Sequence, residues 1–547
     1  MKFAVLVLAV AAAFAIDAQE TPQLAESIEV RVTNLDVVVT DRSGKPVTGL
    51  TAEDFEIYES GTQQPISNFY EVTAQSTSVA EREVMPARNR RRIVVFVDNF
   101  SITPLLRNQA LQAFERSLDT LMRPEDEAML VFWNQGLEIV TPLTSDRNLL
   151  VTRFREASKR SAGGTTVESQ RRSIAMLATR LLDEANSNQT GRSHKVAYAL
   201  SLEAARSHGE LVWSAGKMLI EDMKRTITTL SGVEGKKALI FIGAELPEHP
   251  ALELFQEIDS MYFPFIRDIK PAALRDADRR LIGGMTELAN HANANGVTMY
   301  MVDGADRSRL ADASEKSPYD MDTVNQAEVN TPRALRQIAW STGGIAVPSG
   351  KNFASALKTV AGDLSSYYSL GYRSPEGDDV TARRVTVKVK RDGMNVRTRD
   401  TYVPKSDEDR VRERLIANVF HAGRIVSDFE VTLDTGSIER KNNGRSVLPL
   451  VVTFPSSITL IADGDSLAGS FEVSIVTGLE NGALSRVSTS LQPLKFAAAD
   501  RSKLDAAKTL SFRAPLEISK GPQIVSVAVT DKLAGTTGFA RVRVSGD

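Results

Sequence analysis

The chain of 547 residues contains no cysteine, which excludes disulfide bonds, cysteine nucleophiles and thiolate metal sites together. Aromatic residues make up only 6% of it, and its net charge of −3 lies close to balance. Nucleic-acid-binding proteins usually carry a clear excess of Lys and Arg on one face. The composition therefore argues against nucleic acid as the main partner.

Long apolar runs are also scarce. The first of them, Phe3–Ala15, follows a single lysine and precedes small residues, which is typical of a secretory signal peptide. It is shorter than the roughly 20 residues that span a bilayer. We expect residues 1–18 to be a cleaved signal peptide and the mature chain to be secreted or periplasmic. No membrane span is expected, and no lipid anchor, because no cysteine stands at the cleavage point.

Motifs of common enzyme classes are missing as well. The sequence has no Gly-x-Ser-x-Gly elbow, no phosphate-binding loop with a terminal Gly-Lys-Ser/Thr, and no His-Glu-x-x-His helix. The histidines are scattered and are expected to be surface or packing residues: His194, His208, His249, His291 and His421. We therefore expect a protein that is not an enzyme.

Short β patterns open the part of the chain that follows the signal peptide. Residues 26–73 alternate apolar and polar side chains around turn residues, which indicates an N-terminal β-sandwich. Residues 74–91 are polar and end in a run of arginines, so we expect a solvated linker.

From Ile93 the pattern changes to alternating strands and helices. The continuous apolar run Ile93–Val97 is typical of a strand buried on both faces of a parallel sheet. Residues 92–373 are accordingly predicted to form a doubly wound, Rossmann-like α/β domain with a mostly parallel sheet. Within it, residues 166–232 read as an insertion of two long helices that projects from the domain and packs on itself.

Two further segments complete the predicted organisation. Residues 374–404 indicate a β-hairpin, expected to extend the preceding sheet at one edge. Residues 405–547 begin with a short charged helix and continue as strands separated by Gly and Asn turns, which favours a C-terminal β-sandwich.

Acidic residues follow the predicted parallel strands where ligands bind in open α/β sheets. Asp98 ends the first strand, Glu245 comes just after the fourth, and Asp303 ends the fifth. The loop Gly163–Thr166 adds two hydroxyl groups. Oxygen ligands of this kind suit Mg²⁺ or Ca²⁺. Asp303 and Asp306 are also common turn residues, and we expect them to serve in turns.

These features together resemble the von Willebrand factor type A fold, and in particular the VWFA-related family frequent in acidobacteria. The resemblance covers roughly residues 28–403 and rests on the stretches 39–61, 96–98, 163–165 and 366–372, of which the first and last are the specific ones. It implies a metal-ion-dependent adhesion site whose first loop reads Asp-x-Ser-x-Ser.

The chain departs from that pattern at several positions. Asp98 matches, but Phe100 and Ile102 stand at the two serine positions, with Ser101 displaced by one. The threonine is matched by Thr165 or Thr166, and the later aspartate is replaced by Glu245, again shifted by one. The ligands that remain for a metal are Asp98, Ser101 and Thr165, and no tightly held cofactor is expected. Instead, Asp98 is expected to cap the following helix.

The preferred hypothesis is an exported module for recognition of a protein or cell-envelope ligand, in which two β-sandwiches flank an adhesion-type α/β domain. Its recognition surface is predicted to lie on the strand-end loops, with the residues Asp98, Phe100, Ser101, Thr165, Thr166 and Glu245. The alternative is a metal-dependent hydrolase that uses Asp98 and Glu245 at the same strand ends. The sequence leaves the partner, the oligomeric state and the role of the helical insertion open.

Overall fold

The computed structural model describes most of the chain after the predicted signal peptide, residues 1–18, which lies outside the described part. The described residues are 32–73, 90–187, 193–233, 235–266, 272, 280–305, 321–347, 353–374, 381–420, 427–440, 446–479 and 482–546. They belong to two compact units, one built on Asn34–Arg424 with Gly478–Arg486, the other on Ile425–Thr477 and Val487–Asp547. Within the described residues, no helix is both long and apolar enough to cross a membrane.

A mixed six-stranded sheet forms the centre of the first unit. Its strands lie in the order β10-β9-β8-β5-β6-β7. All neighbouring pairs are parallel except β6 and β7, which are antiparallel. The strands are β5 (Arg91–Asp98), β6 (Glu127–Trp133), β7 (Leu137–Thr144), β8 (Lys236–Gly243), β9 (Val297–Asp303) and β10 (Ala346–Val347). The predicted alternation of strands and helices around a mostly parallel sheet is confirmed.

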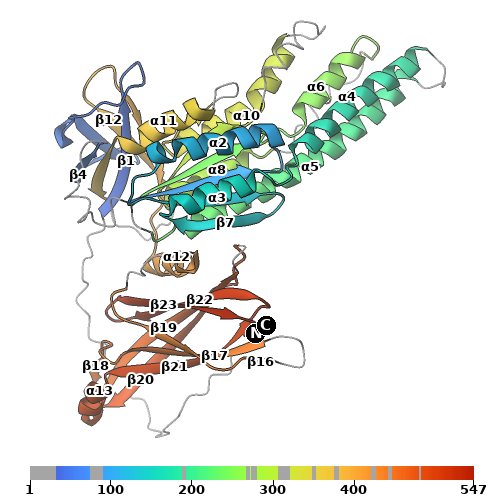
Figure 1. Ribbon diagram of the computed structural model, residues 1–547. Coiled ribbons are helices and arrows are strands. Elements are labelled where there is room, and N and C mark those ends of the chain that lie inside the picture. The colour runs from blue at the N-terminus through green and yellow to red at the C-terminus, as the bar shows by residue number, and fades with distance from the viewer. Residues whose placement is uncertain are drawn as a thin grey trace. The chain divides into compact units, whose positions relative to one another are not determined.

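Helices cover both faces of this sheet (Figure 1). Every residue of β5 is buried, as a strand covered on both sides requires. Ile93, Val95 and Val97 pack with α2 (Pro104–Leu121), α3 (Arg147–Ala157) and α11 (Phe353–Ser365) in one core. Alternate residues point to the other face, where Phe96 meets Phe241 at 6.1 Å between ring centroids. The remaining covering helices are α5 (His194–Thr229), α8 (Ile282–Ala294) and α10 (Met321–Ser341).

The predicted helical insertion is an antiparallel arm. Helices α4 (Gly164–Asn186) and α5 run side by side beyond the sheet and pack with α6 (Leu252–Tyr262) (Figure 1). With 36 residues, α5 is about 54 Å long at 1.5 Å per residue. The apolar stripe of the arm is buried within it, around Leu181, Leu202 and Tyr262. As predicted, the insertion packs on itself, although Leu200 and Met218 of α5 are exposed.

The first unit also contains a β-sandwich of two four-stranded sheets, whose strands come from both sides of the α/β domain in the chain. One sheet has the order β13-β1-β11-β4 and the other β14-β12-β2-β3. The strands are β1 (Val32–Thr40), β2 (Phe55–Glu59), β3 (Thr62–Gln64), β4 (Ile66–Val72), β11 (Tyr367–Arg373), β12 (Arg383–Val389), β13 (Asn395–Arg397) and β14 (Thr401–Tyr402), with a short turn of 3-10 helix, η1 (Ala52–Asp54). Half of its strands thus come from residues after the α/β domain.

The prediction that the later strands extend the α/β sheet is therefore wrong. β11 pairs with β4, and β12 pairs with β2, placing Val387 opposite Ile57. Both residues lie in one apolar core with Leu370. The alternation in 383–389 indicates one buried face but does not say which sheet covers it, because strands of the same period fit any apolar sheet face.

The predicted solvated linker ends before Arg91, because this residue already belongs to a buried strand. Arg91 and Arg92 belong to β5 and are only 1% and 4% exposed. Arg91 pairs with Asp126, and Arg92 pairs with Glu127 at 3.1 Å. A buried guanidinium needs a partner, and here Asp126, directly before β6, and Glu127, its first residue, supply the two carboxylates.

The second unit contains two sheets that enclose a common core. One joins β15, β16 and β21 to β17, and the other joins β18, β19, β20, β22 and β23. Phe454 of β17 packs against Phe471 of β19 at 4.8 Å between ring centroids. The bounds are β15 (Thr432–Thr435), β16 (Glu439–Arg440), β17 (Ser446–Pro455), β18 (Ile461–Asp463), β19 (Ser466–Leu479), β20 (Ser488–Ala497), η3 (Ala498–Asp500), α13 (Arg501–Ala507), β21 (Thr509–Ile518), β22 (Pro522–Asp531) and β23 (Thr537–Ser545).

The short charged helix predicted at the start of this unit is α12 (Asp407–Phe420). It packs against α5 and belongs to the first unit instead.

Candidate functional site at the strand ends

The candidate site lies at the carboxyl edge of the six-stranded sheet. In the register of the sheet, Asp98 is opposite Trp133 and Gly243 is opposite Asp303, so four parallel strands end together. The strand order reverses between β5 and β8, where open α/β sheets usually bind ligands. The structure thus brings Asp98 and the loop with Glu245 to one edge, as predicted.

Asp98 is engaged by its own loop. Its carboxylate accepts the backbone N–H of Phe100 at 3.1 Å and of Ser101 at 3.2 Å, and it accepts the hydroxyl of Ser101. The side chain is almost fully buried. The following helix α2 begins later, at Pro104, with Thr103 as its N-cap. The prediction of a helix cap is therefore wrong in detail, because Asp98 stabilises the turn between strand and helix.

Ser101 joins two loops of the edge. Its hydroxyl donates to Asp98 and accepts the backbone N–H groups of Ala244 at 2.9 Å and of Glu245 at 3.1 Å. The displaced serine thereby holds the loop after β8 against the loop after β5. A structural role of this kind could not be recognised from the spacing, since the two loops are more than a hundred residues apart in sequence.

The loop Gly163–Thr166 meets the first loop through its two glycines. Gly163 donates its N–H to the carbonyl of Asn99 at 2.9 Å, and Gly164 donates to that of Ile102 at 3.2 Å. A Cβ atom at Gly164 would lie 2.4 Å from the carbonyl oxygen of Ser101. Thr165 and Thr166 are exposed in the first turn of α4. The predicted loop is therefore at the edge, with its hydroxyl-bearing side chains facing solvent.

We expect Gly164→Ala to lower the free energy of unfolding by about 1–3 kcal/mol, because the new methyl group overlaps backbone atoms that cannot move alone. Urea denaturation measures the loss. Gly362→Ala is the matched control, since a Cβ atom there meets nothing within 4 Å. In helix α11 this control should be neutral or slightly stabilising. Equal effects of the two substitutions would contradict the close contact.

The two apolar residues at the serine positions fill space. Ile102 is 0% exposed and belongs to the core between the sheet and α2. Phe100 is half-buried and meets Trp133 edge to face at 5.8 Å between ring centroids. Trp133 in turn donates its indole N–H to Asp222 of α5 at 2.9 Å. Aromatic packing thus attaches the first loop to Trp133 of the sheet, and the hydrogen bond of Trp133 connects it to α5.

Burial is the main cause of the pKa shifts of Asp98 and His208 at the edge. Burial raises the pKa of Asp98 to about 7, although the hydrogen bonds from Ser101 and Phe100 oppose this, and the negative charge of Glu245 adds to it. Burial lowers the pKa of His208 on α5, an effect that Glu245 opposes. His208 is only 6% exposed, which agrees with the predicted packing role.

Asp303 accepts the N–H of Ala305 at 3.0 Å, as expected of a turn residue, whereas Asp306 lies outside the described residues.

The residues at the edge do not fit a divalent cation. Such an ion needs about six oxygen ligands. Phe100 and Ile102 supply none, and both the carboxylate of Asp98 and the hydroxyl of Ser101 are engaged in hydrogen bonds within the chain. Over the described ranges, no group of three or more acidic or histidine side chains has an arrangement that would hold a metal.

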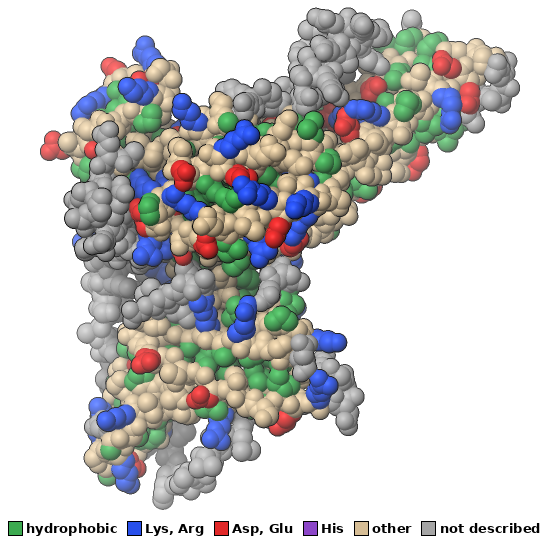
Figure 2. All heavy atoms as spheres, viewed as in Figure 1, with side chains coloured by type: hydrophobic (Ala, Val, Ile, Leu, Met, Phe, Trp, Pro, Cys, Tyr) green, Lys and Arg blue, Asp and Glu red, His purple; other side chains and the backbone are tan. Residues whose placement is uncertain are grey.

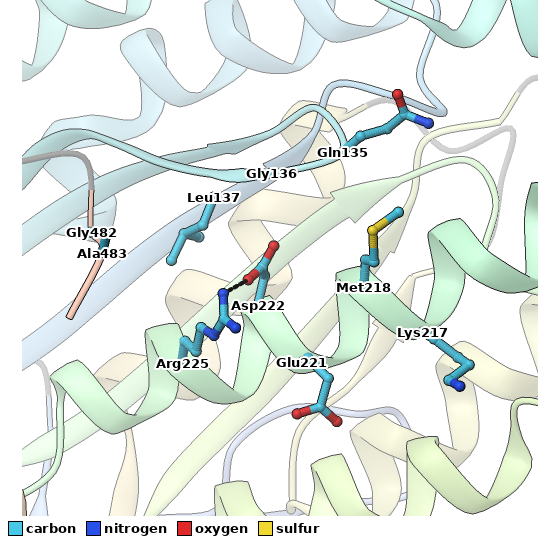
Figure 3. Close-up of a pocket in the computed structure, with 10 residues that line it drawn as sticks. All are labelled: Gln135, Gly136, Leu137, Lys217, Met218, Glu221, Asp222, Arg225, Gly482 and Ala483. Carbon is cyan, nitrogen blue, oxygen red and sulfur yellow. Dashed lines mark hydrogen bonds and ion pairs between the residues drawn. The ribbon is translucent and has the colours of Figure 1, made fainter. Parts of the chain in front are cut away.

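Sequence reasoning missed a groove beside this edge. It lies between the turn that joins β6 to β7 and the helix α5, has a volume of about 480 Å³, and is lined by Gln135, Leu137, Lys217, Met218, Asp222 and Arg225, among others (Figure 3). The hairpin turn Asn134–Gly136 was the available signal in the sequence. The lining residues of α5 follow ordinary helical spacing and gave no indication of a groove.

Comparisons with known proteins leave the family open. No protein-family model matches the chain, and no curated protein matches it. Three solved structures share 10–11% identity with it. A structural-genomics target has a TM-score of 0.15, with 22% of this chain and 88% of that chain covered.

The β-glucuronidase of Bacteroides uniformis has a TM-score of 0.14, with 36% of this chain and 20% of that chain covered. The pilus adhesin SpaC of Lactobacillus rhamnosus GG has a TM-score of 0.23, with 92% of this chain and 61% of that chain covered. Scores this low support no argument about fold or function.

Proposed function

We propose that this chain is an exported, non-enzymatic recognition module of the von Willebrand A type, which binds a protein or cell-envelope ligand at the carboxyl edge of its six-stranded sheet. The observation that carries the proposal is the convergence of three separate loops, those containing Ser101, Gly163 and Ala244, on one edge. Such an edge offers a rigid, polar surface rather than a single reactive group.

Several features support the von Willebrand A assignment. If the strands β5 to β10 are numbered 1 to 6 in chain order, their order across the sheet is 6-5-4-1-2-3. The third strand, β7, lies at one edge and is antiparallel to its neighbour. The Gly-Gly-Thr-Thr loop contacts the Asp98 loop, which the resemblance implies for an adhesion site. The hydrogen bonds of Asp98 and Ser101 favour binding without a tightly held metal.

The hydrolase alternative finds less support. Asp98 is 1% exposed, so a substrate has no access to its carboxylate. Its partners are backbone N–H groups and a serine hydroxyl that is itself fully engaged. On the face shown in Figure 2, basic and acidic side chains are interspersed, which fits a protein-binding surface better than a polyanion-binding one.

Affinity capture tests the proposal. The full mature chain, immobilised and incubated with solubilised envelope proteins, is expected to retain a partner that the triple variant Thr165→Ala/Thr166→Ala/Glu245→Gln retains at least tenfold less. Thr359→Ala, an exposed threonine on α11, is the control and should retain the partner fully. Retention that is the same for all three proteins would refute recognition at this edge.

A further inference from the structure

The groove between the β6–β7 turn and α5 belongs to the carboxyl edge of the sheet. Gln135 lies in the turn that follows Trp133, the last residue of β6, and Leu137 is the first residue of β7. Trp133 also touches Phe100 of the first loop. The groove, whose volume is about 480 Å³, therefore lies beside the strand end that contacts the first loop.

The floor of the groove is fixed by Asp222. This buried carboxylate accepts the indole N–H of Trp133 and a guanidinium N–H of Arg225, each at 2.9 Å. Figure 3 shows the Arg225 side chain turned toward Asp222 and Leu137. The bond to Asp222 uses one of the five N–H donors of the guanidinium, and the Arg225 side chain is 70% exposed. The arginine is thus held in place with most of its donors available to a ligand.

A second cationic side chain, that of Lys217, also lines the groove on α5. Lys217 lies over the ring of Trp213, with its ammonium 4.4 Å from the ring centroid. No carboxylate pairs with it anywhere in the described part of the chain. Glu221, which also lines the groove, is paired with Lys224 at 2.8 Å. The carboxylates beside the groove are therefore paired, while two cationic side chains still have donors to offer.

Gln135 is held in an unfavourable backbone conformation at the rim. Its φ is 58°, in the left-handed region that Gly and Asn adopt far more readily. Its side chain is exposed and makes no hydrogen bond within the described residues. Strain of this kind persists where the residue is needed for another reason. The amide of Gln135 supplies a reason, because it adds a hydrogen-bonding group to the rim.

We propose that this groove binds an acidic side chain of an extended segment of a partner protein. The guanidinium of Arg225 binds the carboxylate, and the ammonium of Lys217, about two helical turns away on α5, binds a carbonyl or carboxylate oxygen farther along the segment. The amide of Gln135 binds the backbone of the segment, and Leu137 and Met218 contact a neighbouring apolar side chain. The inference rests on the proposed recognition function and names the chemistry of its ligand. Carboxylate recognition by a guanidinium held in place is both strong and directional.

Selection from a random peptide display library against the full mature chain tests this proposal. The enriched peptides are expected to carry Asp or Glu next to an apolar residue, and their versions with Asn or Gln should bind at least tenfold more weakly. Lys217→Ala and Arg225→Ala should each weaken binding at least tenfold. Lys195→Ala, an exposed lysine elsewhere on α5, is the matched control and should not change it.

Two further readouts separate binding from folding. Gln135→Gly should raise the melting temperature or leave it unchanged, because glycine relieves the strain, and yet weaken peptide binding severalfold. Peptide binding should also change the fluorescence of Trp213, since an oxygen atom of the peptide draws the ammonium of Lys217 away from its ring.

Enriched peptides without acidic residues, or peptides whose binding is the same in Lys217→Ala, Arg225→Ala and the control, would overturn the groove proposal. If such peptides instead lose binding to the triple variant at Thr165, Thr166 and Glu245, recognition at the edge stands without the groove. If they respond to neither set, both proposals fail.

Discussion

Replacing Arg91 with Ala is expected to lower the free energy of unfolding by about 3–5 kcal/mol, because it leaves a buried carboxylate without its partner. The Asp126 side chain is 0% exposed and accepts N–H groups from the backbone of Arg91 at 3.0 Å and from its Nε at 2.8 Å. The guanidinium also donates to the carbonyls of Leu121 and Leu364, each at 3.1 Å. Urea denaturation followed by circular dichroism measures the loss.

An exposed ion pair provides the control for this prediction. Arg155 pairs with Glu115, but its side chain is 67% exposed. Arg155→Ala should therefore change stability by less than about 1 kcal/mol. The double variant Arg91→Met/Asp126→Leu should lose less than Arg91→Ala, since it removes both charges. A loss for Arg91→Ala no greater than that for Arg155→Ala would contradict the assignment of a buried pair.

Stability should also depend on pH through Asp98. The pKa of this carboxyl rises from about 3.9 in an unfolded chain to about 7 in the folded protein, mainly because of burial. Between these values the folded state binds more protons than the unfolded state, so stability falls as the pH rises from about 4 to about 7 and is constant above. The full difference corresponds to about 4 kcal/mol.

The variant Asp98→Asn isolates this effect, because other groups titrate in the same range. Burial of His208 and partial burial of His291 lower their pKa values, and the two residues act in the opposite direction, since neutral histidines favour the folded state at higher pH. Relative to Asp98→Asn, the wild-type protein should lose about 3 kcal/mol of stability between pH 5 and pH 8. Parallel stability curves for the two proteins would show that Asp98 is ionised throughout.

The local pattern of apolar and polar residues was sufficient to predict much of the fold. The continuous apolar run Ile93–Val97 predicted a strand buried on both faces, and all of β5 is buried. The two long helices predicted within residues 166–232 pack on each other around Leu181 and Ala197. These predictions succeeded because strand and helix periods determine which side chains share a face, whatever lies opposite.

Predictions that needed a particular partner failed. Arginine runs are usually solvated, yet Arg91 is buried because it pairs with Asp126, the residue directly before the next strand. The alternation in β12 was correct, but its partner is β2, more than three hundred residues earlier. Likewise, Phe100 was interpreted as a lost metal ligand and as part of a recognition surface, and nothing in the sequence indicated that its ring packs on Trp133.

By itself, the sequence determined the succession of strands and helices, the α/β class of the central part, and the arrival of Asp98 and Glu245 at one sheet edge, because parallel strands all end on the same side. Only the tertiary structure decided that Ser101 joins two loops, that Arg91 is buried, and that Lys217 and Arg225 line a groove with Gln135. Each of these depends on contacts between side chains distant in sequence, and local periodicity carries no information about such pairs.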